Sequence, residues 1–340
     1  MAFRTIAVPR GHDGRTSLTA ETRARRIFRR ISGSSPRRAQ ELALVSPSPS
    51  SPVVPSRAAA PETPFFFESH GRPLYAVFHA AGPTRAEGRP AQARPVIVHV
   101  HSIGVEQITL YRAEVLAARA AAAHGFPVLR FHARGHGDSA GSFADVTLGA
   151  LVQDAGVAAD EARRRSGAAR VLWLGVRFGA LVAALAARGR DDAAGFVFWE
   201  PVHKPGDFFR QQLRTLLFSQ VAGGKKPDAT VDEMLERIAT DGRADVLGYY
   251  LYRAFVDSTR DASLAEALEG ATAPVRLAQV QARAKLASGH NQLVESLFIR
   301  GVDAKTALVQ EDPGYQLMSN PAWESDALTR TTVEWLDALA

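Results

Sequence analysis

The sequence predicts an α/β fold with a mostly parallel central sheet covered by helices on both faces. From residue 64 onward, short apolar segments of strand length alternate with helical segments. "PVIVHVH" (95–101) is a continuous strand of the kind buried on both faces of a parallel sheet. "VLWLGVRFGALVAALAA" (171–187) reads as a strand, a turn bounded by glycines, and an Ala-rich helix. Repeated strand–helix units of this kind imply parallel strands.

The elements follow one another in a regular order. A β-hairpin comes first, made of "PFFFES", a turn at His70–Gly71 and "RPLYAVFHA". The alternating units that follow are a strand 95–101, a helix 110–125, a strand 126–133, a helix 148–167, a strand 170–176, a helix after Phe178, and a strand 195–202. The alternation ends with a strand 274–282, a helix 291–302, a strand 305–312 and a helix 326–340.

Residues 203–270 interrupt this alternation. Their amphipathic segments, such as "DFFRQQLRTLLFSQ" and "VDEMLERIAT", predict a helical insertion. The insertion follows directly on the strand "GFVFWEPV", so it is expected to lie over the carboxyl edge of the sheet as a lid. Ligands of open α/β sheets bind at that edge. Its many apolar positions lead us to expect an apolar pocket under the lid, with Arg177 as a polar anchor at its floor; a lid packed without a cavity is the alternative.

The first 62 residues differ in composition from the rest of the chain. They hold eleven arginines and four acids, a net charge of 11 − 4 = +7, whereas the whole chain carries +6, so residues 63–340 are close to neutral. This Arg-, Ser- and Pro-rich segment is expected to be a disordered tail, with the α/β domain spanning 63–340. It has too few aromatic residues for base stacking, so no nucleic-acid partner is expected.

Composition excludes several classes of protein. There is no cysteine, so disulfides, thiolate metal sites and a cysteine nucleophile are excluded. No apolar run approaches the ~18 residues of a membrane span, and the N-terminus lacks the apolar centre of a signal peptide. A cytoplasmic protein is therefore expected. The ten histidines show no motif such as H-E-x-x-H, and no P-loop or dinucleotide fingerprint is present, so no metal and no cofactor are expected.

The elbow at residues 175–179 carries the most specific signal. The strand–turn–helix context is the one in which a nucleophilic serine is held in the pattern G-x-S-x-G, but here the five residues read "GVRFG", with Arg177 at the centre. Together with "ARGHGDSAG" after the preceding strand, this order resembles the α/β-hydrolase superfamily over residues 64–340. The resemblance implies the α/β-hydrolase fold.

A narrower resemblance is to the second of the two hydrolase-like groups associated with exosortase A systems, bacterial loci linked to exopolysaccharide and protein sorting. That group also places an arginine in the elbow, as in "GVRFGALVA". The segments that carry the likeness are "GDSAGSFAD" (137–145), "FWEPV" (198–202) with "FFRQQLR", and "VLGYYL" (246–251).

A serine-hydrolase triad is missing at two positions. Arginine stays protonated and has no lone pair for attack. The catalytic histidine should follow the last strand, but the loop "PGYQLMSNPAWES" contains none, and the last histidine of the chain is His290. The joint loss indicates that serine chemistry is absent.

Arg177 should instead attract an anion, since it lies at a helix N-terminus and carries a planar guanidinium. Two alternatives stay open: an internal pair with Glu200, or a small anionic or acyl ligand held there with the neighbouring candidate binding residues Val176, Phe178, Ser102, Ile103 and Glu200.

Weaker candidates leave enzymatic activity open. Glu200 with His203 could activate water as a general base. His101 and Ser102 lie at the mouth of the site, where an unassisted serine is a poor nucleophile. His136, Asp138 and Ser139 are expected to shape a loop. The three resulting functional hypotheses are a ligand-binding protein without the triad, an ester or thioester hydrolase with an unconventional base, and a structural partner in an exopolysaccharide or exosortase-type system.

Overall fold

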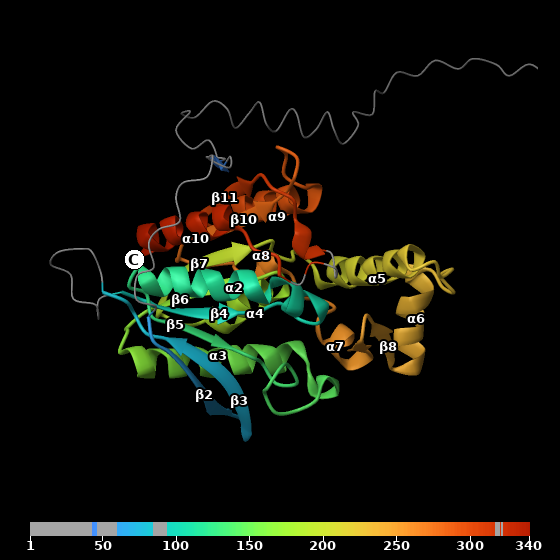
Figure 1. The fold of residues 1–340 in the computed structure, drawn as a ribbon, viewed down its shortest axis with the longest axis horizontal. Coiled ribbons are helices and arrows are strands. Elements are labelled where there is room, and N and C mark those ends of the chain that lie inside the picture. Colours follow the sequence, from blue (N-terminus) through green and yellow to red (C-terminus); the bar gives the residue numbers. More distant parts are fainter. Residues whose placement is uncertain (1–42, 46–59, 84–93, 317–319, 321) are drawn as a thin grey trace, which may run out of the picture. The chain divides into compact units, whose positions relative to one another are not determined.

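The computed structural model describes residues 43–45, 60–83, 94–316, 320 and 322–340. A nine-stranded sheet forms the centre, in the order β1-β11-β10-β7-β6-β4-β5-β3-β2 (Figure 1). The β2–β3 and β3–β5 pairs are antiparallel, and every other pair is parallel. The predicted α/β architecture is confirmed.

The strands of this sheet fall where the apolar segments predicted them, with one addition. They are β1 (Ala43–Val45), β2 (Glu62–Ser69), β3 (Arg72–His79), β4 (Val96–Val100), β5 (Val128–Phe131), β6 (Val171–Val176), β7 (Ala193–Trp199), β10 (Val275–Val280) and β11 (Ala304–Val309). The addition is β1, which pairs with β11 inside the segment expected to be a disordered tail. The remaining tail residues, 1–42 and 46–59, lie outside the described residues.

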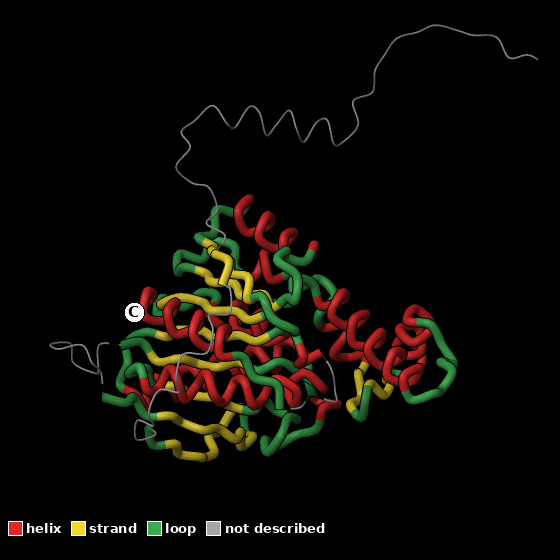
Figure 2. The backbone as a smooth tube through the Cα atoms, turned by 45° about the horizontal axis from the view of Figure 1, so that its top comes forward, coloured by secondary structure: helices red, strands yellow, loops and turns green. Residues whose placement is uncertain are grey.

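Helices cover both faces of the sheet, as the red and yellow layers of Figure 2 show. On one face, α2 (Val105–Ala123) and α10 (Asp326–Leu339) pack on Ile97, Leu174 and Val197. On the other face, α3 (Leu148–Ser166), α4 (Phe178–Ala187) and α9 (Ser288–Ile299) pack on Val98, Trp173 and Phe198. Adjacent residues of a strand thus belong to opposite cores, because strand side chains alternate between faces.

The insertion after β7 contains helices and one hairpin. The helices are α5 (Pro205–Ala222), α6 (Val231–Asp241), α7 (Arg253–Ser258) and α8 (Leu264–Ala267). Between α6 and α7, β8 (Arg243–Val246) and β9 (Tyr249–Tyr252) form a two-stranded antiparallel sheet. The expectation of a purely helical insertion is therefore wrong at this point. The turn at Leu247 and Gly248, both with positive φ, is the kind that joins two strands tightly.

No described helix is long and apolar enough to cross a membrane.

The elbow between β6 and α4 fixes the backbone at the carboxyl edge of the sheet. Arg177 adopts φ 53° and ψ −116°, which is strained for a residue other than glycine. The flanking glycines permit the close packing that holds it there. A Cβ on Gly179 would lie 2.2 Å from the carbonyl oxygen of Val100, and one on Gly175 would lie 2.6 Å from Cα of Ala180. The two glycines therefore allow the backbone crossing at the elbow, where Gly179 lies against the backbone of β4 and Gly175 lies against the backbone of α4.

We predict that Gly179→Ala lowers the free energy of unfolding by about 3 kcal/mol or prevents folding, because the added methyl group meets backbone atoms that cannot move independently. Gly156→Ala in α3 is the matched control. A Cβ there meets nothing within 4 Å, so it should be neutral or stabilise the helix by up to about 1 kcal/mol. Denaturant unfolding of both variants measures the contrast, and equal effects would contradict the proposed crossing.

Candidate functional site

Arg177 forms a buried ion pair with Glu106 above the elbow. Its Nη2 lies 2.9 Å from Glu106 Oε1, and its Nε donates to both carboxylate oxygens at 3.1 Å. Both side chains are less than a tenth exposed. Burial lowers the pKa of Arg177, but the carboxylate of Glu106 more than offsets this, so that the pKa lies above its ordinary value. The guanidinium is therefore a fixed positive charge.

Glu106 is held in place from several directions. It lies in the first turn of α2, where the helix dipole stabilises a negative charge. Ser102 donates to its Oε2 at 2.9 Å, and Gln212 of α5 donates to its Oε1 at 2.9 Å. The arrangement therefore joins the loop after β4, the elbow and the insertion.

The remaining partners of Arg177 come from the residue after β7 and from α5. Nη1 donates to the backbone carbonyl of Glu200 at 2.9 Å, and Nη2 donates to Oε1 of Gln211 at 2.9 Å. One of the two alternatives for Arg177 is an internal pair with Glu200; Arg177 does form an internal pair, but its partner is Glu106. Glu200 contributes a backbone oxygen, while its side chain accepts a hydrogen bond from the N–H of Val280 on β10.

The polar pocket lies beside this ion pair and has a volume of about 220 Å³. The side chains relevant to its chemistry are Arg177, Glu200, His203, Gln211, Gln281 and His290. Burial is the main cause that raises the pKa of Glu200 to about 7, against the opposing effect of Arg177. His203 also lines the pocket, and burial lowers its pKa. The pocket thus brings Glu200 and His203 to one cavity, with no hydrogen bond between them among the described side chains.

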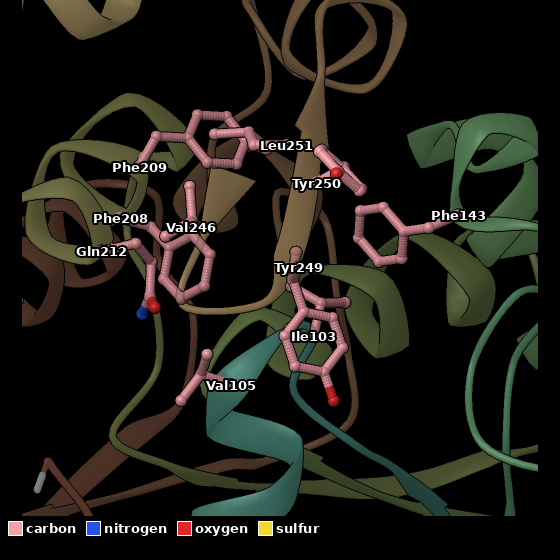
Figure 3. Close-up of a pocket in the computed structure, with 11 residues that line it drawn as sticks. Ile103, Val105, Phe143, Phe208, Phe209, Gln212, Val246, Tyr249, Tyr250 and Leu251 are labelled. Atoms are coloured by element: carbon pink, nitrogen blue, oxygen red, sulfur yellow. The ribbon is translucent and has the colours of Figure 1, made fainter. Parts of the chain in front are cut away.

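The apolar pocket is a separate and smaller cavity of about 30 Å³ (Figure 3). Its walls are Phe208 and Phe209 of α5, residues of the β8–β9 hairpin, and Ile103 and Val105 at the start of α2. Arg177 is not among the residues that line it. The expectation of an apolar pocket with Arg177 at its floor is therefore wrong, because α5 packs its phenylalanines into the site while Arg177 faces the polar pocket.

The other candidates have defined positions. Val176 and Phe178 are core residues, and Phe178 packs against Phe208 and Phe255 with ring centroids 5.4 Å from each. His101 is buried and contacts the carboxylate of Glu114. Ser139 donates to the backbone carbonyl of His132 at 2.6 Å, a structural role in the loop where His136 and Asp138 also lie.

Two site residues were missed by the sequence analysis. Glu106 is 71 positions from Arg177, and only the rotation of α2 brings it to the elbow. Tyr315 follows β11, in the short helix η3 (Gly314–Gln316), where a triad histidine would be expected. Its buried ring lies 5.9 Å from the guanidinium carbon of Arg177. The acid in the first turn after an expected strand was an available signal for Glu106; for Tyr315 the signal was its place in the last loop.

Comparison with known proteins agrees with the fold. The model of the family described as serine aminopeptidase, S33, matches residues 91–279, more than half of the chain. No curated protein matches the chain in sequence.

Many solved structures share the fold. Est1E from Butyrivibrio proteoclasticus, with ferulic acid bound, is 18% identical with a TM-score of 0.55, over 80% of this chain and 99% of Est1E. An esterase of Pyrococcus furiosus is 11% identical with a TM-score of 0.53, over 88% of this chain and 97% of the esterase. The mouse α/β hydrolase domain-containing protein 10 is 15% identical with a TM-score of 0.50, over 82% of this chain and 98% of the mouse protein.

We predict that Glu106→Gln lowers the free energy of unfolding by about 3–5 kcal/mol, because it leaves the guanidinium of Arg177 buried without a counter-charge. The double variant Glu106→Leu/Arg177→Met should lose much less, since no buried charge remains. A double-mutant cycle by denaturant unfolding measures the coupling. Additive losses would show that the two side chains do not depend on each other.

We also predict a pH-dependent contribution from Glu200. A carboxyl whose pKa rises from 4.5 to about 7 on folding binds its proton more tightly in the folded state, so it stabilises the protein below pH 4.5 and this stability is lost as the pH rises to about 7. The stability of the wild type relative to Glu200→Gln should therefore fall by about 3 kcal/mol between pH 4.5 and 8. A difference that does not change with pH would contradict the raised pKa.

Proposed function

The chain belongs to the serine aminopeptidase S33 family of α/β hydrolases, and we propose that it is a member without serine catalysis that binds a small anionic or acyl ligand in the polar pocket beside Arg177. One observation carries the proposal. The central position of the elbow, which presents the nucleophile in serine hydrolases, holds a buried arginine that lines a cavity of about 220 Å³.

The guanidinium is suited to binding because it is held in a fixed orientation. Glu106, Gln211 and the carbonyl of Glu200 fix its plane. Nη1 carries two N–H groups, and the described residues provide a partner for one of them. A carboxylate in the pocket would accept the second, at little cost in side-chain ordering. Amide groups of Gln281 and Gln316 border the same cavity and can donate to a second oxygen.

The absence of serine chemistry rests on the same residues. An arginine paired with Glu106 cannot attack a carbonyl carbon. Ser102 donates to Glu106, whose carboxylate oxygens already accept hydrogen bonds from Arg177, so no free base is shown beside this hydroxyl. The loop after β11 contributes a tyrosine to the site. Membership of the group associated with exosortase A systems, and a structural role in such a system, remain part of this proposal through the arginine in the elbow.

A second candidate function rests on Glu200. With a pKa of about 7 and a position on the polar pocket, this carboxylate could take a proton from a water molecule as the water oxygen attacks the carbonyl carbon of an ester or thioester, and return the proton to the alcohol or thiol that leaves. This reaction needs no covalent intermediate. Ligand binding is favoured because Glu200 already accepts a hydrogen bond from the backbone of Val280.

Binding of carboxylates of increasing length tests the proposal. Acetate, ferulate (the ligand of Est1E, here a carboxylate on an aromatic body) and octanoate are titrated into wild type and into Arg177→Met/Glu106→Leu by calorimetry. We expect binding to the wild type and a loss of at least tenfold in the double variant, which removes the donor without leaving a buried charge. Equal affinities, or no binding of any of the three acids to the wild type, would overturn the role of Arg177.

Catalysis is measured on the same preparations. A fluorophosphonate probe should leave the protein unlabelled, and p-nitrophenyl and acyl-thioester substrates should not turn over. Turnover that rises through pH 7 and is abolished in Glu200→Gln would favour the second candidate function instead. Stoichiometric labelling of Ser102 would contradict both.

A further inference from the structure

A cluster of buried polar side chains lies between β4 and α2, separate from the polar pocket. His99 and His101 are two residues apart, so both point to the same face of the sheet as Ile97, the face covered by α2. Glu114 lies on the buried face of α2, among the alanines that pack on the sheet. The side chains of all three are at most 4% exposed. A carboxylate and two imidazoles therefore occupy positions where the fold requires core residues.

Most hydrogen-bonding atoms of this cluster have no partner in the part of the chain that the structure describes. His101 Nδ1 contacts Glu114 Oε2. Both ring nitrogens of His99, Nε2 of His101 and Oε1 of Glu114 have no hydrogen-bond partner among the described residues. A buried polar atom without a partner costs about 1–3 kcal/mol, and more when it carries charge. Four such atoms in one cluster are an unusual concentration, since buried polar groups are nearly always paired.

The donors are close enough to share one ion. One ligand atom from each of the three residues lies within 4.8 Å of the others, and His99 Nε2 is 3.9 Å from Glu114 Oε2. Tetrahedral ligands of a zinc ion are about 3.3 Å apart, which small rotations of these side chains can reach. Two imidazoles and one carboxylate form a donor set that zinc uses widely. The nearby cation, Arg130, is occupied by a hydrogen bond to His79 and by the ring of Tyr111.

We propose that His99, His101 and Glu114 bind one divalent transition-metal ion, with Zn²⁺ as the ion that the donor set suits best. The pair H-x-H at the end of a strand, with a third ligand from the covering helix, is not one of the usual zinc motifs. This proposal replaces the expectation of no metal site. Three protein ligands leave the fourth position of a zinc ion to a water molecule. The ion would bond to one nitrogen or oxygen atom of each side chain and thereby link the end of β4 to α2.

Zinc and cobalt loading tests the site. The full chain is purified, its metal content is measured, and it is then unfolded with a chelator and refolded with or without Zn²⁺ or Co²⁺. We expect one equivalent of metal per chain, visible cobalt absorption typical of tetrahedral coordination, and a melting temperature that falls when the metal is withheld. Wild type that folds without metal and takes up neither ion would overturn the proposal.

The variants distinguish this site from adventitious binding. His99→Leu/Glu114→Gln removes two donors and fills a core position with an apolar side chain, so it should fold without metal and lose metal binding by at least a hundredfold. His132→Gln is the matched control, because His132 lies next to His101 with ring centroids 5.8 Å apart but is outside the donor set, and it should keep one equivalent. Equal metal binding by the double variant would place the ion elsewhere. Carboxylate binding in the polar pocket is an independent readout and should persist in the double variant.

Discussion

The buried pair of Arg177 and Glu106 is the interaction on which the arrangement of the site depends. Through its hydrogen bonds the pair joins the ends of three neighbouring strands, β4, β6 and β7, to helix α5 of the insertion. A buried charge is tolerated only with its partner in place. The position of the insertion over the sheet is therefore linked to the electrostatics of the elbow, and both change if either charge is lost.

The same pair accounts for the character of the pockets. Gln211 and Gln212 of α5 form hydrogen bonds with the ion pair, whereas Phe208 and Phe209 pack against Phe178 of the elbow helix. One helix thus contributes walls to both a polar and an apolar cavity, and Phe208 borders both. Burial beside an ion pair that is already balanced keeps the Glu200 carboxyl near half-protonated at neutral pH. A charged ligand that enters this cavity can therefore be balanced by the gain or loss of one proton at Glu200.

Local signals in the sequence predicted the fold well and the site only in part. Strands such as β6 are apolar throughout and the elbow is bounded by glycines, and both features are encoded within a few residues. The partner of Arg177 depends on the rotation of α2 relative to a strand 71 residues away, which no short segment specifies. The β8–β9 hairpin was missed because its turn, Leu247–Gly248, lacks the usual Asn-Gly or Asp-Gly signal. The cluster at Glu114 was missed because a carboxylate in an amphipathic helix normally faces solvent.

The two borders of the sheet have consequences for association. On one side, β11 pairs with β1 over three residues, so part of its backbone is already satisfied. On the other side, the eight-residue β2 is the terminal strand among the described residues, with the Phe66 ring 58% exposed and Phe65 covered by the guanidinium of Arg165. A long terminal strand is a template for pairing with another chain, and prolines and charged residues at such an edge oppose this pairing. Pro64 and Glu68 of β2 therefore protect this border of the sheet, and their replacement by apolar residues is the change expected to promote association between chains.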